Sequence, residues 1–254
     1  MEKHNNFISV IIPAFNAEKY IKTSIKSVLR QTFQEFEIIA IDDSSSDNTF
    51  MLMTELSKID KRIVLVQNRQ NIGVSLTRNR GISMAKGNWI AFLDSDDEWE
   101  ETKLEKQLKK AEETGGDFIF TGSRFIDSSG RYYHQKLNVP EKIDFKHLLK
   151  QNIISCSSVL IKKNVIEKYP MKGDYLHEDY AVWLQVLKKT LYAYGVNEPL
   201  LIYRISKSSK SGNKIKSAIM TYRVYLYVGL NRITAFYYWI HYICRSIKKY
   251  QKLK

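Results

Sequence analysis

Residues 89–98 read Trp-Ile-Ala-Phe-Leu-Asp-Ser-Asp-Asp-Glu, a run of apolar residues that ends in a cluster of carboxylates. The apolar part predicts a buried β-strand, with residues 94–97 directly at its end. Carboxylate oxygens suit hard cations, and Mg²⁺ is commonly held by one or two carboxylates while substrate phosphates and water complete the shell. The stretch therefore predicts a metal and nucleoside-diphosphate site, although an acidic turn before a helix starting near residue 101 would also explain it.

Three further apolar runs, at residues 7–12, 38–41 and 63–66, precede this one. Their spacing of about 25 to 30 residues is typical of successive strands in βαβ units. Between them, apolar residues at helical spacing mark two amphipathic helices, one around residues 21–29 and one around residues 52–59. Right-handed crossovers then predict an α/β fold with a doubly wound, mostly parallel sheet. In such sheets ligands bind beyond the carboxyl ends of the strands.

Composition is that of a globular protein. The chain has 254 residues, of which 44% are hydrophobic, enough to bury a full core as one large domain or as a domain with an extension. Its two cysteines, Cys156 and Cys244, cannot form a disulfide framework. Because no signal-peptide pattern precedes the first apolar run, we expect a cytoplasmic protein.

The formal net charge of +13 is concentrated at the C-terminal end. Residues 201–254 contain twelve Lys and Arg residues and no Asp or Glu, whereas the first 200 residues contain 28 basic and 27 acidic residues. The body of the chain is therefore nearly neutral and the tail is basic.

Five segments, in this order, resemble the family 2 glycosyltransferases, which are inverting enzymes with the GT-A nucleotide-sugar fold. They are Val-Ile-Ile-Pro-Ala-Phe-Asn at 10–16, Ile-Asp-Asp-Ser-Ser-Ser-Asp at 41–47, Gly-Val-Ser-Leu-Thr-Arg-Asn-Arg-Gly-Ile at 73–82, Leu-Asp-Ser-Asp-Asp at 93–97 and His-Glu-Asp at 177–179. The family more often has Gly where Ser44 stands and Ala where Thr77 stands. The resemblance runs along most of the first 205 residues.

The resemblance implies a GT-A domain at residues 1–205, with a nucleotide-binding half at about 1–98 and an acceptor half at about 99–205. Residues 206–254 would form a C-terminal helical extension. The implied reaction moves a hexosyl unit from a UDP-sugar to a hydroxyl of a lipid-linked glycan in surface-polysaccharide synthesis, of O-antigen, capsule or lipooligosaccharide type. The implied cofactor is Mn²⁺ or Mg²⁺.

For the nucleotide, the resemblance implies that Phe15 packs on the uracil ring and that Asp43 accepts a hydrogen bond from its imide nitrogen. A carboxylate acceptor has no complement in cytosine, and an unpaired buried polar group costs about 1 to 3 kcal/mol. Pro13 and Asn16 would belong to the same donor-binding loop, and Arg78 would lie near the base or the diphosphate. The alternative for Asp43 is a helix cap, for which Asp47 is the better candidate.

For the diphosphate, Asp96 is the expected metal ligand. Asp94 and Ser95 would contact the ribose or the donor sugar, and Asp97 would support them. The metal would offset the charge that builds on the departing UDP.

For the acceptor, inversion requires a base opposite the leaving group, and Asp179 is the candidate. It stands at the start of an apolar-periodic helix, where the macrodipole stabilises negative charge. Glu178 would be its neighbour, and His177 would contact the acceptor or the metal. Trp183 would stack on a sugar of the acceptor or fill the core. Simple N-terminal capping by Glu178 or Asp179 is the alternative.

A predicted last strand at residues 199–203 precedes the basic segment 204–212, which is typical of a lid over a diphosphate, with Arg204 contacting phosphate, or of a solvated linker. The tail predicts a helix with one apolar stripe and basic residues near its end; the stripe comprises Ile233, Phe236, Tyr237, Ile240, Ile243 and Ile247. The stripe falls short of the roughly 20 residues that a membrane span needs. It predicts contact with an anionic membrane surface at the inner face of the cell membrane, or packing on the catalytic domain or a second subunit.

Two other function classes can be weighed against this one. A haloacid-dehalogenase-like phosphatase also places Asp-x-Asp after an apolar strand, but it does so on its first strand, and here three strands come first. A nucleic-acid-binding protein would explain the basic tail and leave the acidic cluster without a role. We therefore expect no nucleic-acid partner.

Overall fold

The structure, a computed structural model, describes residues 6–173, 175–205 and 214–251. Its strands are β1 (Ile8–Ala14), β2 (Phe36–Asp42), β3 (Ile63–Gln67), β4 (Trp89–Phe92), β5 (Glu98–Trp99), β6 (Phe118–Ile126), β7 (Tyr132–Leu137), β8 (Lys142–Ile143), β9 (Leu160–Lys162) and β10 (Ala193–Arg204). Its helices are α1 (Ile21–Leu29), α2 (Thr49–Ile59), α3 (Val74–Met84), α4 (Lys103–Thr114), α5 (Phe145–Lys150), α6 (Lys163–Ile166), α7 (Glu178–Thr190), α8 (Lys214–Tyr227) and α9 (Arg232–Gln251), with a 3-10 turn at Cys156–Ser158.

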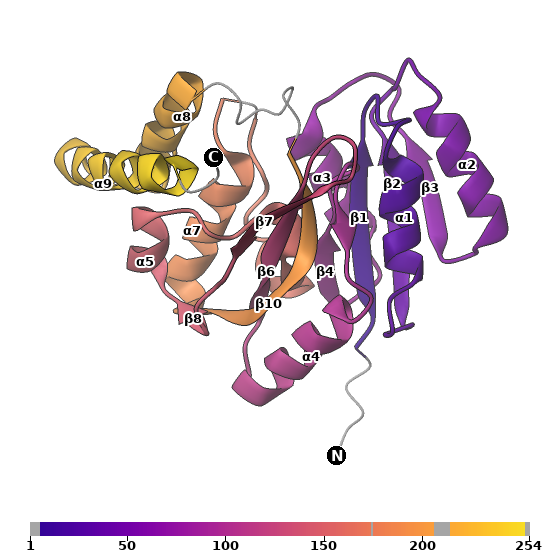
Figure 1. The fold of residues 1–254 in the computed structure, drawn as a ribbon, viewed down its shortest axis with the longest axis horizontal. Helices are drawn as coiled ribbons and strands as arrows, with labels where there is room; N and C mark the ends of the chain where they lie inside the picture. The colour runs from indigo at the N-terminus through magenta and orange to yellow at the C-terminus, as the bar shows by residue number, and fades with distance from the viewer. Residues whose placement is uncertain (1–5, 174, 206–213, 252–254) are drawn as a thin grey trace.

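The strands form one sheet in the order β3-β2-β1-β4-β9-β6-β10-β5, with β7 beside β6 and β8 beside β10 (Figure 1). The four predicted apolar runs are confirmed as β1 to β4, which pair in parallel. Strand β9 runs antiparallel to β4 and to β6, while β6 and β10 are parallel. The predicted α/β class and mostly parallel sheet are confirmed, and the expected nucleotide and acceptor halves share this one sheet.

Helices cover both faces of the sheet, as doubly wound topology requires. Neighbouring residues of β1 show how, because Val10 belongs to the apolar cluster that includes residues of α1, α2 and α4, while Ile11 belongs to the cluster that includes residues of α3 and α7. Both side chains are fully buried. The close approach of α3 to β1 depends on Gly81, since a Cβ there would lie 2.5 Å from a methyl carbon of Ile11.

Strand β10 is longer than the predicted strand at residues 199–203. It begins at Ala193, and its pairing with β6 shifts register between Val196 and Leu201. Pro199 lies inside this irregularity, where its missing N–H interrupts no regular ladder. The sequence pattern around the proline therefore located only the second part of the strand.

The C-terminal helices α8 and α9 pack beside α5 and α7, at the left of Figure 1. The expected apolar stripe of α9 points away from the domain, with Ile233 85% exposed and Phe236 52% exposed. A neighbouring face of α9 packs inward instead through Ala235, Trp239 and Tyr242. Packing on the catalytic domain is therefore wrong for Ile233 and Phe236, whereas contact of the stripe with a second subunit stays a prediction. None of the helices within the described residues is both long enough and apolar enough to cross a membrane.

Candidate active site

An open cavity of about 590 Å³ lies at the carboxyl ends of β1, β2 and β4. Residues from both halves of the chain line it, including the loops after these strands and the start of α7. Most of the predicted site residues reach it: Pro13, Phe15, Asp43, Arg78, Asp94, Ser95, Asp96, Asp97, His177, Glu178 and Asp179. The chain folds so that motifs up to 166 residues apart, from Pro13 to Asp179, face one space.

The end of the cavity formed by β1 and β2 combines an exposed aromatic ring with a fixed carboxylate. Phe15 is 50% exposed. The Asp43 carboxylate is buried and accepts hydrogen bonds from Asn68 Nδ2 at 2.6 Å and from the backbone N–H groups of Ile72 and Gly73 at 3.0 and 2.9 Å. Gly73 adopts a φ of 84° to present its N–H at the start of α3.

The helix-cap alternative for Asp43 is wrong. Its carboxylate makes no bond to the start of α2, whereas Asp47 Oδ1 accepts from the N–H of Thr49 at 3.0 Å. Asp43 is instead held rigidly against the cavity wall.

Arg78 joins the two halves of the cavity. Its guanidinium lies 2.5 Å from Asp94 Oδ1 and 3.1 Å from Glu178 Oε1, and its side chain is only 5% exposed. Burial alone would lower the pKa of Arg78, but the surrounding negative groups raise it above its usual value. The guanidinium therefore stays charged and neutralises carboxylates that would otherwise repel one another.

Three carboxyl groups that line the cavity, those of Asp96, Asp97 and Asp179, have a raised pKa. For Asp97 the causes are burial and then the nearby charges of Asp94 and Asp96. Burial, and then the nearby charge of Asp94, raise the pKa of Asp96 to about 6. Burial, and then the charge of Glu178, raise the pKa of Asp179 to about 6. The Asp179 carboxylate also accepts a hydrogen bond from the N–H of Tyr180 at 2.7 Å, at the first turn of α7. A carboxyl group that titrates near neutrality is suited to exchange a proton with a substrate.

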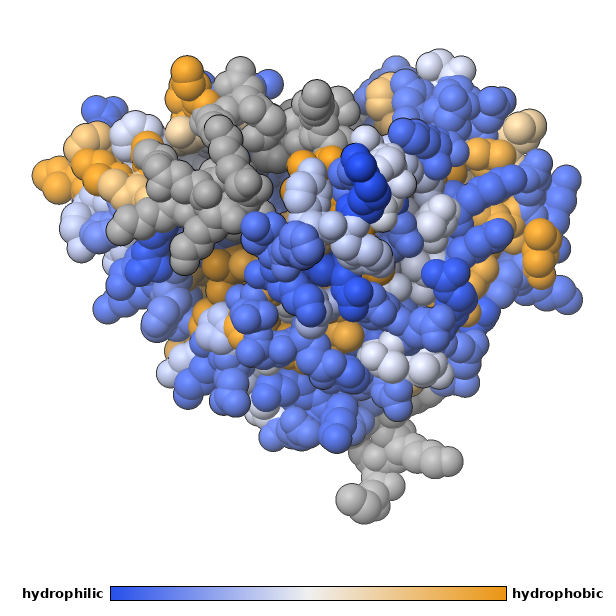
Figure 2. Space-filling model, in the orientation of Figure 1, coloured by the Kyte–Doolittle hydropathy of each residue, from blue (hydrophilic) through white to orange (hydrophobic). Residues whose placement is uncertain are grey.

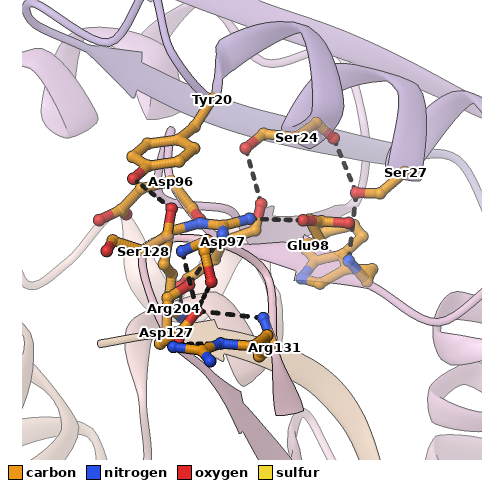
Figure 3. A network of polar contacts seen from close by, with 12 residues as sticks. Tyr20, Ser24, Ser27, Asp96, Asp97, Glu98, Asp127, Ser128, Arg131 and Arg204 are labelled. Carbon is orange, nitrogen blue, oxygen red and sulfur yellow. Dashed lines mark hydrogen bonds and ion pairs between the residues drawn. The ribbon is translucent and has the colours of Figure 1, made fainter. Parts of the chain in front are cut away.

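The acidic loop after β4 is held from behind through its backbone (Figure 3). The Ser24 hydroxyl lies 2.8 Å from the carbonyl oxygen of Ser95 and 2.7 Å from that of Asp97. Arg204 Nε donates to the carbonyl oxygen of Asp96 at 2.9 Å. Because these carbonyl groups are bonded on the protein side, the loop has a fixed shape beside the cavity.

Arg204 does not line the cavity, so its expected contact with phosphate is not supported. Its guanidinium pairs with Glu98 at 2.6 Å, donates to the carbonyl oxygen of Asp127 at 3.2 Å and stacks 4.3 Å from the ring of Tyr20. Its backbone N–H donates to Asp97 Oδ1 at 2.9 Å. Arg204 therefore supports the acidic loop from beneath. Most of the segment that we expected to act as a lid lies outside the described residues.

Two other predicted contacts are wrong. Trp183 is fully buried on α7, where its ring packs against Phe92 and Phe118, so it cannot touch an acceptor. Asn16 does not line the cavity. Its Oδ1 accepts a hydrogen bond from the N–H of Ser46 at 2.9 Å, which joins the loop after β1 to the loop after β2.

The cavity also contains residues that sequence reasoning missed. Residues 152–156 line one wall, and Tyr203 and Ser217 line others. Ser217 Oγ lies 3.0 Å from His177 Nε2, which brings α8 to the rim. None of these residues belongs to a recognisable motif. The one signal in the sequence was that Tyr203 is the last residue of the strand predicted at residues 199–203.

The sequence model of glycosyl transferase family 2 matches residues 9–169. The chain is 37% identical over 243 residues to a Bacillus subtilis protein that bears the name of a teichuronic acid biosynthesis glycosyltransferase, TuaG, and the match covers 95% of this chain and 96% of that protein. It is 36% identical over 245 residues to the Escherichia coli UDP-Glc:alpha-D-GlcNAc-diphosphoundecaprenol beta-1,3-glucosyltransferase WfgD, with 96% of this chain and 94% of that protein covered.

A solved structure has the same fold. Residues 1–349 of Staphylococcus aureus TarS, in complex with UDP, superpose with a TM-score of 0.71 at 18% identity, covering 95% of this chain and 72% of that one. The mannosyltransferase PcManGT of Pyrobaculum calidifontis, in complex with GDP-Man and Mn²⁺, gives a TM-score of 0.67 at 14% identity, covering 91% and 69%. The expected GT-A architecture is confirmed.

Replacing Arg204 by Gln tests the support of the acidic loop. The change leaves Glu98 without its cation and the carbonyl oxygen of Asp96 without its donor, so we expect the free energy of unfolding to fall by about 3 to 5 kcal/mol. Urea denaturation measures it. The matched control is Arg131→Gln, because Arg131 also pairs with Asp127 but is 85% exposed, and its loss should cost less than about 1 kcal/mol. Equal costs for the two variants would contradict the supporting role.

Proposed function

The chain belongs to glycosyl transferase family 2, and from this membership we propose that it moves a hexosyl unit from a UDP-sugar to a hydroxyl group of a lipid-linked oligosaccharide. The product would enter a surface polysaccharide of the O-antigen, capsule or lipooligosaccharide type. The observation that carries the proposal is one cavity that combines an aromatic and carboxylate pair, an acidic strand end and a carboxyl group with a pKa of about 6.

The donor nucleotide would lie against Phe15 and Asp43. The half-exposed ring of Phe15 offers a stacking surface for uracil, and the Asp43 carboxylate, fixed by three protein donors, keeps acceptor capacity for an imide N–H. A UDP complex of TarS and a UDP-Glc substrate in the name of WfgD support uridine as the nucleoside.

The acidic loop suits a divalent cation. Asp96 is the proposed ligand, with Asp94 beside it. Burial, and then the charge of Asp94, raise the pKa of Asp96, and a bound cation would offset the repulsion between the two carboxylates. Within the described residues no three His, Cys, Asp or Glu side chains form a ready metal site, as is usual where phosphates complete the shell. When bound, Mn²⁺ or Mg²⁺ would stabilise the negative charge on the departing UDP.

Asp179 is the proposed general base. Family 2 enzymes invert the anomeric centre, so the acceptor hydroxyl must lose its proton to a group on the attacking side. Asp179 lines the same cavity as Asp96, and its raised pKa makes its carboxylate a better proton acceptor than an ordinary Asp. Arg78, paired with Asp94 and Glu178, would hold the donor and acceptor parts of the cavity in register.

The phosphatase and nucleic-acid-binding interpretations have no support. The family match begins at residue 9 and spans the acidic loop, so it accounts for the Asp-x-Asp cluster as part of a glycosyltransferase. The basic residues that suggested nucleic acid are concentrated in residues 201–254, outside the matched segment.

We further propose that the C-terminal helices rest on the inner face of the cell membrane. Figure 2 shows hydrophobic residues gathered over the outer ends of α8 and α9, at its upper left. Ile215, Ile233 and Phe236 are 77%, 85% and 52% exposed, and no acidic residue follows Glu198. Exposed apolar side chains among basic ones favour the interface of an anionic bilayer.

The donor site predicts a stabilisation by UDP that requires metal. Because ligand binding to the native state raises the melting temperature, UDP with Mn²⁺ should raise it and UDP alone should raise it less. Asp96→Asn should abolish the Mn²⁺ effect, whereas Asp117→Asn, an exposed carboxyl group outside the cavity, should keep it. A larger shift with another nucleotide would contradict the role of Asp43 in binding uracil. No shift with any nucleotide would contradict the proposed reaction.

The proposed base predicts an acid limit to turnover. Since the carboxylate form is required and the pKa of Asp179 is raised to about 6, turnover should fall about tenfold for each pH unit below about 6. Asp179→Asn should lower turnover by about 10² to 10⁴ while UDP still binds. The assay is UDP release from UDP-glucose with a synthetic N-acetylglucosaminyl-diphospholipid acceptor.

Glu178→Gln sharpens this assignment. Removing the Glu178 charge should lower the pKa of Asp179, so the acid limb should move to lower pH. A limb that stays in place, or near-normal turnover in Asp179→Asn, would remove Asp179 from the mechanism.

The membrane proposal predicts sedimentation with anionic vesicles. The full chain should sediment with phosphatidylglycerol vesicles, less so at high salt, and remain in solution with phosphatidylcholine. Ile233→Asp should weaken the binding, whereas Ile59→Asp, at an 80% exposed position on α2, should not. The proposal would be contradicted if the chain bound neither kind of vesicle. If it also eluted as a dimer in gel filtration and Ile233→Asp made it a monomer, the stripe would be a subunit contact instead.

A further inference from the structure

A second hollow, of about 350 Å³, lies between Tyr175 and the outer face of α8. We call it the α8 groove. It is lined by Tyr175, Ile215, Lys216, Ile219, Met220 and Arg223. The groove thus combines apolar side chains with two basic ones, and it belongs to neither the donor pocket nor the stripe of α9.

The groove follows from the helical spacing of α8. Positions 215–216, 219–220 and 223 recur at three to four residues and so share one face. Other positions of α8 pack into the core, among them Val224 and Tyr225, which are fully buried. The helix is therefore anchored on one side, and the groove is a fixed surface on the other.

The α8 groove and the active-site cavity are lined by the same two segments, the stretch before α7 and the first half of α8. Ser217, the residue after Lys216, lines that cavity and contacts His177, and Tyr175 stands two residues before His177. Arg223 lies six residues beyond Ser217, about 9 Å along the helix axis. A ligand whose one end sits beside Asp179 can therefore extend over the rim and along the groove.

The charges of the groove suit phosphate. Arg223 is exposed, and in the described part of the chain it forms no ion pair. Lys216 is also exposed and lies one helical turn from Ile219. A guanidinium with free donors binds phosphate oxygens well, while Ile215 and Ile219 offer a hydrocarbon surface alongside.

We propose that the α8 groove binds the diphosphate and the first isoprenoid units of the lipid-linked acceptor, an inference that rests on the proposed function. Arg223 and Lys216 contact the diphosphate, and Ile215 and Ile219 contact the hydrocarbon chain. The sugar at the other end of the diphosphate then reaches past His177 to Asp179. A free anion would need no apolar wall, and an uncharged lipid would need no Arg223; a lipid diphosphate uses both.

The test is the binding of farnesyl diphosphate to the full chain saturated with UDP and Mn²⁺, measured by isothermal titration calorimetry. Filling the donor site first prevents the probe's diphosphate from binding there. Arg223→Gln should weaken the affinity at least about tenfold, the order expected for one lost hydrogen bond to a charged group. The matched control is Arg232→Gln, because Arg232 is an exposed arginine on α9 outside the groove, and it should bind as the wild type does.

A second variant tests the apolar wall. Ile219→Ser should weaken farnesyl diphosphate and leave methyl diphosphate unchanged. No binding to the wild type, equal losses in Arg223→Gln and Arg232→Gln, or equal affinity for the farnesyl and methyl probes would each overturn the proposal. If UDP itself fails to bind, the donor site is contradicted instead, and the comparison of the two arginine variants still decides the groove.

Discussion

The active-site cavity depends on the buried guanidinium of Arg78. Carboxyl groups from the end of β4 and the start of α7 converge there, and the ligand proposed for the cavity is itself an anionic diphosphate. Arg78 pairs with Asp94 on one side and Glu178 on the other, at 2.5 and 3.1 Å. An arginine suits this position because its fork reaches two carboxylates at once and stays charged when buried. Breaking either pair would leave a carboxylate beside other carboxylates without its cation.

The unequal treatment of the remaining carboxylates follows from the same arrangement. Asp94 and Glu178 have a cation within hydrogen-bonding distance, whereas Asp96 and Asp179 do not, and their pKa values rise to about 6. Asp97 also forms no ion pair within the described residues, and its carboxylate accepts a hydrogen bond from the backbone N–H of Arg204 instead. Of these groups without a cation, we assign the metal to Asp96 and the acceptor proton to Asp179. Arg78 thereby separates the carboxylates that hold the site together from those that can act on a ligand.

The sequence predicted most of the nucleotide-binding half because its determinants are local. Strands β1 to β4 are continuous apolar runs, and the carboxyl ends of parallel strands lie at the same edge of a sheet. The sequence alone therefore predicted that residues such as Asp43 and Asp96 lie at one site. The helical periodicity of α7 already indicated that Trp183 is buried, because Val182 and Val186 mark the buried face of this helix. The path of the Arg204 side chain and the approach of residues 152–156 to Arg78 depend on tertiary packing, for which the sequence has no periodic signal. The sequence also did not predict strand β7, because this strand is mostly exposed and polar and so has no apolar pattern.

The single sheet that carries both halves has a mechanical consequence. Strand β9 is hydrogen-bonded to β4 on one side and β6 on the other, so the halves cannot swing apart as hinged lobes without breaking backbone hydrogen bonds. The strand ends that form one wall of the cavity are therefore fixed at folding rather than at binding. Changes in ligand selectivity are then expected from the loops and side chains that stand on this fixed wall.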